Sequence, residues 1–120
     1  MARIEFEAAS IIPLTNEARQ SLLLTLEEQD CAFTVWWAPL SQLWYLTLSV
    51  GGTRVAGGRQ ISANARLIRD HAFAGDLIVV PPAEAVDEAA PGRNAWTEGW
   101  RLAYLTPAQV ATADAVDRWL

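Results

Sequence analysis

The sequence has few of the residues that build catalytic, metal-binding or cross-linked sites. It contains one cysteine, Cys31, one histidine, His71, and no lysine, so that all nine basic residues are arginine. A single cysteine excludes an internal disulfide and any cysteine-based zinc site. His71 has only Asp70 and Asp76 near it in the sequence, whereas acid–base catalysis or metal binding needs several convergent groups. We therefore expect no enzymatic activity, no metal and no cofactor.

Long apolar runs and an excess of positive charge are missing too. No segment approaches the roughly 20 apolar residues that cross a bilayer. Residues 1–7 lack the apolar core of a signal peptide. The net charge is −5 in 120 residues, whereas nucleic-acid binding needs a basic surface. We expect a protein that is made and used without Sec export and that binds neither a membrane nor a nucleic acid.

What the sequence does contain is a series of short alternating segments separated by turn residues. In 31–37 and 43–50 apolar residues recur at every second position, which is typical of strands with one buried face. Gly51-Gly52 suits the positive φ angles of a two-residue hairpin turn, and Gly57-Gly58 is expected to end the strand that follows. The other expected strands cover residues 11–15, 21–26, 53–56, 76–80 and 98–105. About six or seven short strands predict a mainly β fold, a small antiparallel barrel or sandwich.

Two helices complete the predicted structure. Ser62 is suited to cap a short helix near residues 63–71. Thr106 followed by Pro107 is typical of a helix start, and the C-terminal helix that it opens carries one apolar stripe. Residues 1–105 are thus expected to form a single β-rich domain with a core over about 11–105, and residues 106–120 a helical extension. The extension either docks on a neighbouring chain, which we favour, or covers an open end of the barrel.

Five of the six tryptophans are candidates for contact with a partner. Adjacent residues of a strand point to opposite faces, so Trp36 and Trp37 are both buried only if the sheet is covered on each side. Aromatic residues are also enriched in the cores of protein interfaces. Together with the apolar stripe of the C-terminal helix, they give the following candidate partner contacts: Trp36, Trp37, Trp96, Trp100, Val110, Val116 and Trp119.

The order and spacing of several motifs resemble those of the phage baseplate plug family, small proteins of contractile-tailed phages. The resemblance covers roughly residues 11–105, and the C-terminal helix lies beyond it. It rests on Ile12-Pro13-Leu14-Thr15, the strand that Gln20 opens, the strand Cys31 to Trp37, Trp44-Tyr45-Leu46-Thr47-Leu48 with Gly52-Thr53 after it, Asn64 to Asp70, Gly75 to Val80, and Gly99 to Leu105.

The resemblance implies a structural role at the tip of a phage tail. Such a protein is part of the virion, is assembled in the cytoplasm of the bacterial host, and closes the tail tube near the hub and the central spike. Its implied partners are the baseplate hub, the central spike and the tail tube, and no catalytic residues are implied. Two alternatives stay open: another tail-tip component, such as a tube initiator or a hub/spike adaptor, and a small β-barrel that binds a ligand.

Overall fold

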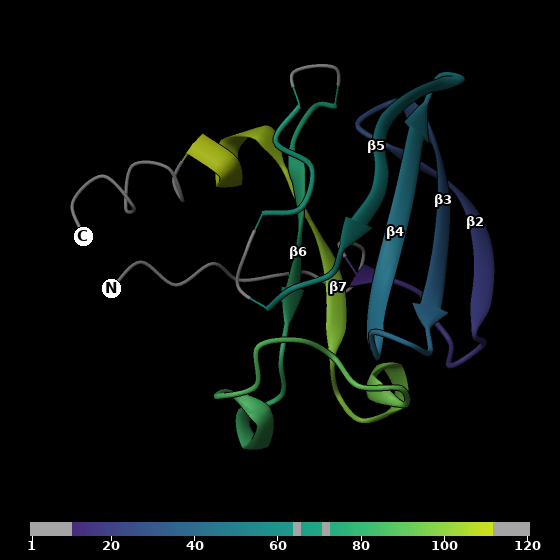
Figure 1. The fold of residues 1–120 in the computed structure, drawn as a ribbon. Coiled ribbons are helices and arrows are strands. Elements are labelled where there is room, and N and C mark those ends of the chain that lie inside the picture. Colours follow the sequence, from purple (N-terminus) through teal and green to yellow (C-terminus); the bar gives the residue numbers. More distant parts are fainter. Residues whose placement is uncertain (1–10, 64–65, 71–72, 112–120) are drawn as a thin grey trace.

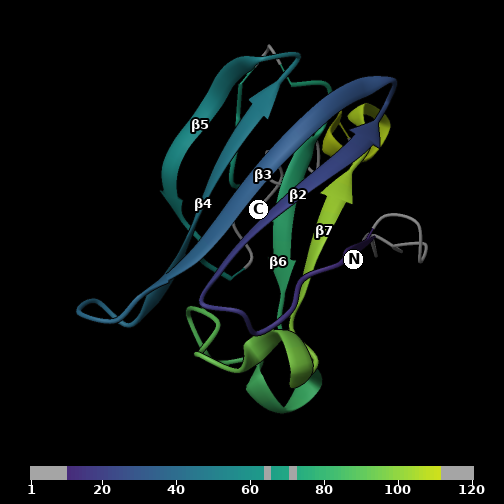
Figure 2. The same cartoon turned by 90° about the vertical axis from the view of Figure 1, so that its right-hand side faces the viewer.

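The computed structural model describes residues 11–63, 66–70 and 73–111, which form two antiparallel sheets (Figure 1). The four-stranded sheet is a meander of β2 (Arg19–Leu26), β3 (Gln29–Ala38), β4 (Leu43–Val50) and β5 (Thr53–Gln60). The three-stranded sheet has the order β1-β7-β6, with β1 (Ile11–Ile12), β6 (Asp76–Val80) and β7 (Arg101–Leu105). The two sheets face each other as an open sandwich and, over the described residues, do not close into a barrel (Figure 2). The predicted mainly β class and strand number are confirmed.

The core lies between the two sheets and follows from the alternation of the strands. Phe33 of β3 and Leu46 of β4 are at most 1% exposed, and Leu22, Leu24 and Leu26 of β2 pack against the same cluster. The opposite sheet contributes Leu77, Val79 and Leu102. Fully burying one such side chain stabilises the fold by about 1.5–3 kcal/mol, so this cluster holds the sandwich together. The core predicted from the period-2 spacing is confirmed.

Two hairpins of the meander have two-residue turns of very different composition. Gly51 and Gly52 join β4 to β5 with φ angles of 56° and 85°, as predicted. Glu27 and Glu28 join β2 to β3 with φ angles of 50° and 62°. A residue with a Cβ in this conformation is strained by roughly 1–2 kcal/mol. The β2–β3 turn therefore holds two glutamates in a backbone conformation that is unfavourable for them.

The strand β5 does not end at Gly57-Gly58, as we had expected, but continues to Gln60 through two breaks in its register. The pairing with β4 shifts between Leu46 and Leu48 and again between Leu48 and Ser49. Gly58 takes up a φ of 58° and donates its N–H to Oγ1 of Thr47 at 3.1 Å. A β-bulge places an extra residue on one strand and increases the local twist, so the glycines mark a bulge rather than a strand end.

The predicted short helix near 63–71 is wrong for the residues that are described there. Ala63 forms an isolated parallel bridge with Val79 and Arg66 an isolated antiparallel bridge with Ile78, so these residues lie beside β6 without forming a helix. His71 lies outside the described residues. Residues 66–69 thus need hydrogen-bond partners other than a helix ladder.

Those partners are a buried carboxylate and a guanidinium. Asp76, 1% exposed, accepts hydrogen bonds from the N–H groups of Ile68 at 2.8 Å, Arg69 at 3.1 Å and Leu77 at 2.7 Å. Arg59 of β5 donates from Nη1 to the carbonyl oxygens of Leu67 and Ile68 at 2.9 and 3.2 Å. These long-range bonds replace the local ones of a helix and hold the segment against β6.

The C-terminal helix begins as predicted. The hydroxyl of Thr106 accepts a hydrogen bond from the Gln109 N–H at 3.2 Å, and Oε1 of Gln109 accepts one from the Thr106 N–H at 2.9 Å. This reciprocal pair is a capping box, which satisfies two backbone donors at a helix start. The described part of the helix covers residues 107–111, so Val116 and Trp119 lie outside it.

Candidate functional site

The adjacent Trp36 and Trp37 lie on opposite faces of the four-stranded sheet, as predicted. Trp36 points away from the core and stacks on Tyr45 of β4, with ring centroids 6.0 Å apart and an interplanar angle of 20°. The guanidinium of Arg19 lies over the same indole, 5.9 Å from its centroid. Such cation–π contacts fix the orientation of both groups. Arg19, Trp36 and Tyr45 also share one row of the strand pairing, and we call them the outer row.

Trp37 points to the core side, where three indoles meet. The rings of Trp37 and Trp44 are 5.5 Å apart, and those of Trp44 and Trp96 are 5.6 Å apart, both edge to face. Trp44 is fully buried and donates from Nε1 to the carbonyl oxygen of Gly92 at 2.7 Å. Because Gly92 and Trp96 belong to the long connection between β6 and β7, this cluster fixes that connection to the four-stranded sheet.

Polar contacts strengthen the same end of the sandwich. The guanidinium of Arg93 lies 5.7 Å from the Trp44 ring centroid and donates to the carbonyl oxygen of Asn16. The amide of Asn16 in turn donates to Oγ1 of Thr97, at 2.6 Å. This end also holds the 3₁₀ turns η2 (Ala83–Ala85) and η3 (Ala95–Thr97). The connection is thus attached at several points.

The remaining candidate contacts fall in three different environments. Trp96 and Val110 are half-buried. Trp100 is only 5% exposed and belongs to the core cluster, so it supports the fold and has little surface to offer a partner. Val116 and Trp119 lie outside the described residues. The structure therefore brings Trp37 and Trp96 together around Trp44 and leaves Trp36 on a separate face.

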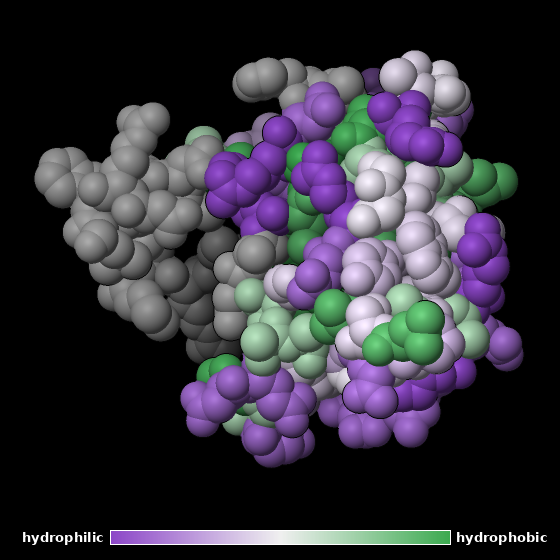
Figure 3. Space-filling view, in the orientation of Figure 1, coloured by the Kyte–Doolittle hydropathy of each residue, from purple (hydrophilic) through white to green (hydrophobic). Residues whose placement is uncertain are grey.

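The face that carries the outer row, which we call the outer face, is poor in charge and rich in small hydroxyl residues. Figure 2 looks onto this face, and the part of Figure 3 that lies over β4 and β5 is mostly pale, the colour of residues of intermediate hydropathy. Its described charged side chains are Arg19, Asp30 and Arg54. A solvent-facing sheet usually alternates apolar residues with strongly polar ones, so this face differs from an ordinary exposed one.

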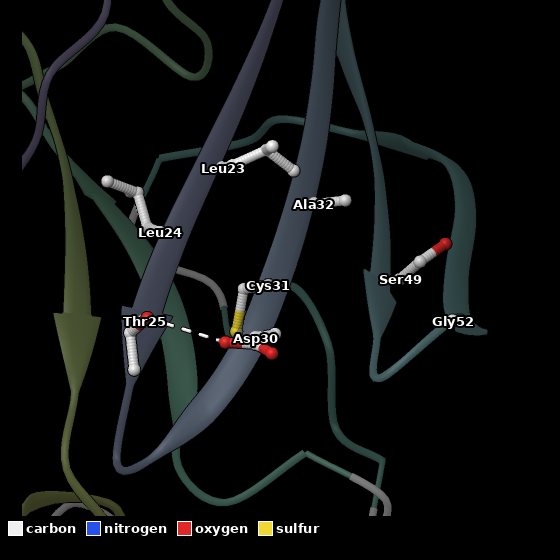
Figure 4. Close-up of a pocket in the computed structure, with 8 residues that line it drawn as sticks. All are labelled: Leu23, Leu24, Thr25, Asp30, Cys31, Ala32, Ser49 and Gly52. Atoms are coloured by element: carbon white, nitrogen blue, oxygen red, sulfur yellow. Dashed lines mark hydrogen bonds between the residues drawn. The ribbon is translucent and has the colours of Figure 1, made fainter.

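A shallow hollow lies on the outer face near the β2–β3 turn (Figure 4). Leu23, which is 84% exposed, stands beside Ala32 and Ser49, whose small side chains leave the depression open. Thr25 and Asp30 close one side through a hydrogen bond between their side chains at 3.5 Å. The hollow offers apolar surface and few convergent polar groups, which is unlike a site for a small polar ligand.

Two titratable groups have shifted pKa values, and both shifts come mainly from burial. Burial raises the pKa of the Tyr104 hydroxyl well above its usual range, and the nearby Glu27 carboxylate raises it further. The hydroxyl donates to the carbonyl oxygen of Ala74 at 2.5 Å, which is a structural role. Burial also raises the pKa of the Cys31 thiol, which disfavours the reactive thiolate.

Within the described ranges, no three His, Cys, Asp or Glu side chains are grouped as metal ligands. The described helices likewise include none that is long and apolar enough to cross a membrane.

Sequence reasoning missed Arg19, Tyr45 and Leu23 as members of the same surface. The signal was available, because alternation places positions 19, 21, 23 and 25 of one strand on one face. It could be used only together with the pairing of β2, β3 and β4, which brings the three residues onto neighbouring positions.

Comparison with known proteins agrees with the resemblance drawn from the motifs. Residues 9–107 match the family model described as the cyanophage baseplate Pam3 plug gp18. A search of curated proteins gave no match. The matched range contains both sheets and the long connection between β6 and β7. The chain therefore belongs to the family of the cyanophage Pam3 baseplate plug, a structural component of a phage baseplate.

Proposed function

We propose that this protein is the plug that closes the tail tube of a contractile-tailed phage, at the hub and the central spike. Its partners are then the hub, the spike and the tail tube, and it acts in the virion after assembly in the host cytoplasm. The observation that carries the proposal is the family match over residues 9–107, which spans nearly the whole described fold.

The construction of the sandwich supports a mechanical role. A plug has to keep its shape under load, and the Trp37–Trp44–Trp96 cluster fixes the longest connection to the four-stranded sheet. Edge-to-face aromatic pairs add about 0.5–1.5 kcal/mol each beyond the area they bury. The net charge of −5 also repels nucleic acid in a channel through which DNA passes. Nothing in this role requires bond-making chemistry.

The C-terminal segment, residues 106–120, is proposed to dock on a neighbouring tail protein. Its capping box at Thr106 and Gln109 starts a helix, and isolated helices shorter than about 12–15 residues are marginal in water. The half-buried Val110 is the described member of its apolar stripe. Such a helix gains most of its stability from the surface on which it lies.

The test of the plug role is a conditional knockout of the gene in its parent phage, complemented in trans. Cryo-electron microscopy of the tails should show density for this chain on the tube axis above the spike with the intact gene, and loss of that density without it. Density at the baseplate periphery, or intact closed tails without the protein, would refute the role.

A second complementation with a chain lacking residues 107–120 tests the docking of the helix. We expect a purified truncated protein with a thermal midpoint close to that of the full chain, and tails that lack it. A large loss of stability would show that the helix supports its own fold instead.

A further inference from the structure

The outer face of the four-stranded sheet is self-complementary about one row of residues. Leu23 pairs with Ala32 across β2 and β3. Along β2, Leu23 is four residues from Arg19, and along β3, Ala32 is four residues from both Trp36 and the turn residue Glu28. Four residues of strand span about 13 Å. The outer row and the acidic turn thus lie at equal distances on either side of the Leu23 row.

This spacing has a consequence for two copies stacked face to face with their strands antiparallel. If the Leu23 rows of the two copies coincide, the Arg19–Trp36 pair of one copy lies over Glu28 of the other, and the same contact occurs twice. Among the described residues, no carboxylate lies within ion-pair distance of Arg19, and Glu28 is exposed. The charges at the two ends of the face therefore complement each other across a two-fold axis.

The centre of the face fits the same arrangement. Leu23 is 84% exposed and stands beside the hollow lined by Ala32, Ser49 and Gly52. Figure 4 shows Ala32 on the strand next to Leu23, Ser49 on the strand beyond it and Gly52 in the turn that follows. At the axis the two Leu23 side chains meet, and the small residues beside them let the two sheets approach to the usual spacing of about 10 Å.

We propose that the outer face binds a second copy of this chain, forming a two-fold symmetric dimer with Leu23 at its centre. The proposal concerns the isolated protein and does not rest on its position in a tail. Four strands of about eight residues present roughly 500 Å² per copy, or about 1,000 Å² in total, near the lower limit for a specific interface. We expect a weak dimer, with a dissociation constant in the micromolar range. A C2 interface of this kind closes on itself without growing further.

The experiment is sedimentation equilibrium of the purified full-length chain from about 1 μM to 1 mM. We expect a monomer–dimer equilibrium that Leu23→Glu weakens about a hundredfold, since both leucines lose their burial and two like charges meet near the axis. Val86→Glu is the matched control, because Val86 is an exposed aliphatic residue, 62% accessible, in the connection between β6 and β7. It should change the dissociation constant less than about twofold.

Charge reversal tests the arrangement itself. Arg19→Glu and Glu28→Arg should each weaken the dimer about tenfold, and the double variant should return to within about threefold of the original. Circular dichroism checks each fold, and Arg19→Gln or Glu28→Gln replaces a reversal that unfolds.

Four results would overturn the proposal: a monomer at 1 mM, a dimer unaffected by Leu23→Glu, a double variant no better than the single ones, or a species larger than a dimer. A monomer whose outer face binds the hub or spike protein instead would also overturn it.

Discussion

Replacement of Gly75 by alanine should be among the most damaging single changes in this protein. Gly75 has a φ of 95°, and a Cβ there would lie 2.2 Å from the carbonyl oxygen of Leu105 and 2.7 Å from the hydroxyl of Tyr104. Neither atom is free to move, because Leu105 is paired with Asp76 in the sheet and the Tyr104 hydroxyl is bonded to the Ala74 carbonyl. The backbone would have to give way at the start of β6.

The cost has three parts that the structure identifies. The unfavourable φ contributes about 1–3 kcal/mol, relief of the overlap about 1–3 kcal/mol, and loss of the Tyr104 hydrogen bond about 1 kcal/mol. We expect a loss of about 3–7 kcal/mol, which lowers the thermal midpoint by roughly 10–30 °C for a chain of this size. A loss of this size removes much of the total stability of a typical small domain.

The assay is urea unfolding followed by tryptophan fluorescence, with Gly92→Ala as the control. A Cβ at Gly92 would have no atom within 4 Å, so that variant should unfold within about 0.5 kcal/mol of the original or be slightly more stable. If Gly75→Ala unfolds within 1 kcal/mol of the original protein, the close packing of β6 against β7 is wrong.

Three further changes probe the core, a turn and a buried hydroxyl. Leu46→Ala should destabilise the protein by about 2–5 kcal/mol through lost burial and a residual cavity, measured by the urea midpoint, and a loss below 1 kcal/mol would contradict its central position. Glu28→Gly should stabilise the monomer by about 1 kcal/mol because it relieves the left-handed strain of the β2–β3 turn; differential scanning calorimetry at low concentration measures this, and a lower midpoint would refute it. The raised pKa of Tyr104 means that the folded state holds its proton more tightly than the unfolded state, so stability should fall above about pH 10 by up to about 1.4 kcal/mol per pH unit. Tyr104→Phe should weaken that fall and leave the part due to the buried Cys31 thiol, whereas Tyr45→Phe should keep it in full. Identical alkaline profiles for both variants would count against the buried hydroxyl.

The strands could be predicted because their information is local. In the segments 43–50 and 76–80 the predicted bounds agree with β4 and β6 to the residue, since alternation and the flanking turn residues are both visible in the sequence. The C-terminal helix start is equally local, because Thr106 and Gln109 are three residues apart and cap each other. Where a structure is decided within a few residues, pattern reasoning was sufficient.

The errors arose where distant groups decide the local structure. Residues 63–70 have reasonable helix formers, yet the carboxylate of Asp76 and the guanidinium of Arg59 bind the backbone of 66–69 in another conformation. Tertiary bonds of this kind override propensity. The glycines at positions 57 and 58 fit either a bulge or a strand end, and only the hydrogen bond from Gly58 to the Thr47 side chain of β4 distinguishes the two.

The candidate surfaces, too, were predicted only where the information is local in the sequence. Alternation alone predicted that Trp36 and Trp37 face opposite ways. It could not show that Trp100 is buried, because that depends on how the end of the connection before β7 packs against both sheets. It also could not join Arg19 and Tyr45 to Trp36, since those residues meet only through the pairing of three strands.

The irregular β5 limits one way in which this protein could associate with other chains. A regular strand at the border of a sheet offers a row of free N–H and C=O groups on which another chain can add, and charged residues and bulges are the usual protection. Here the two register breaks interrupt that row, and Arg54 and Arg59 stand along it. This edge of the sheet is therefore poorly suited to pairing with a strand of another chain.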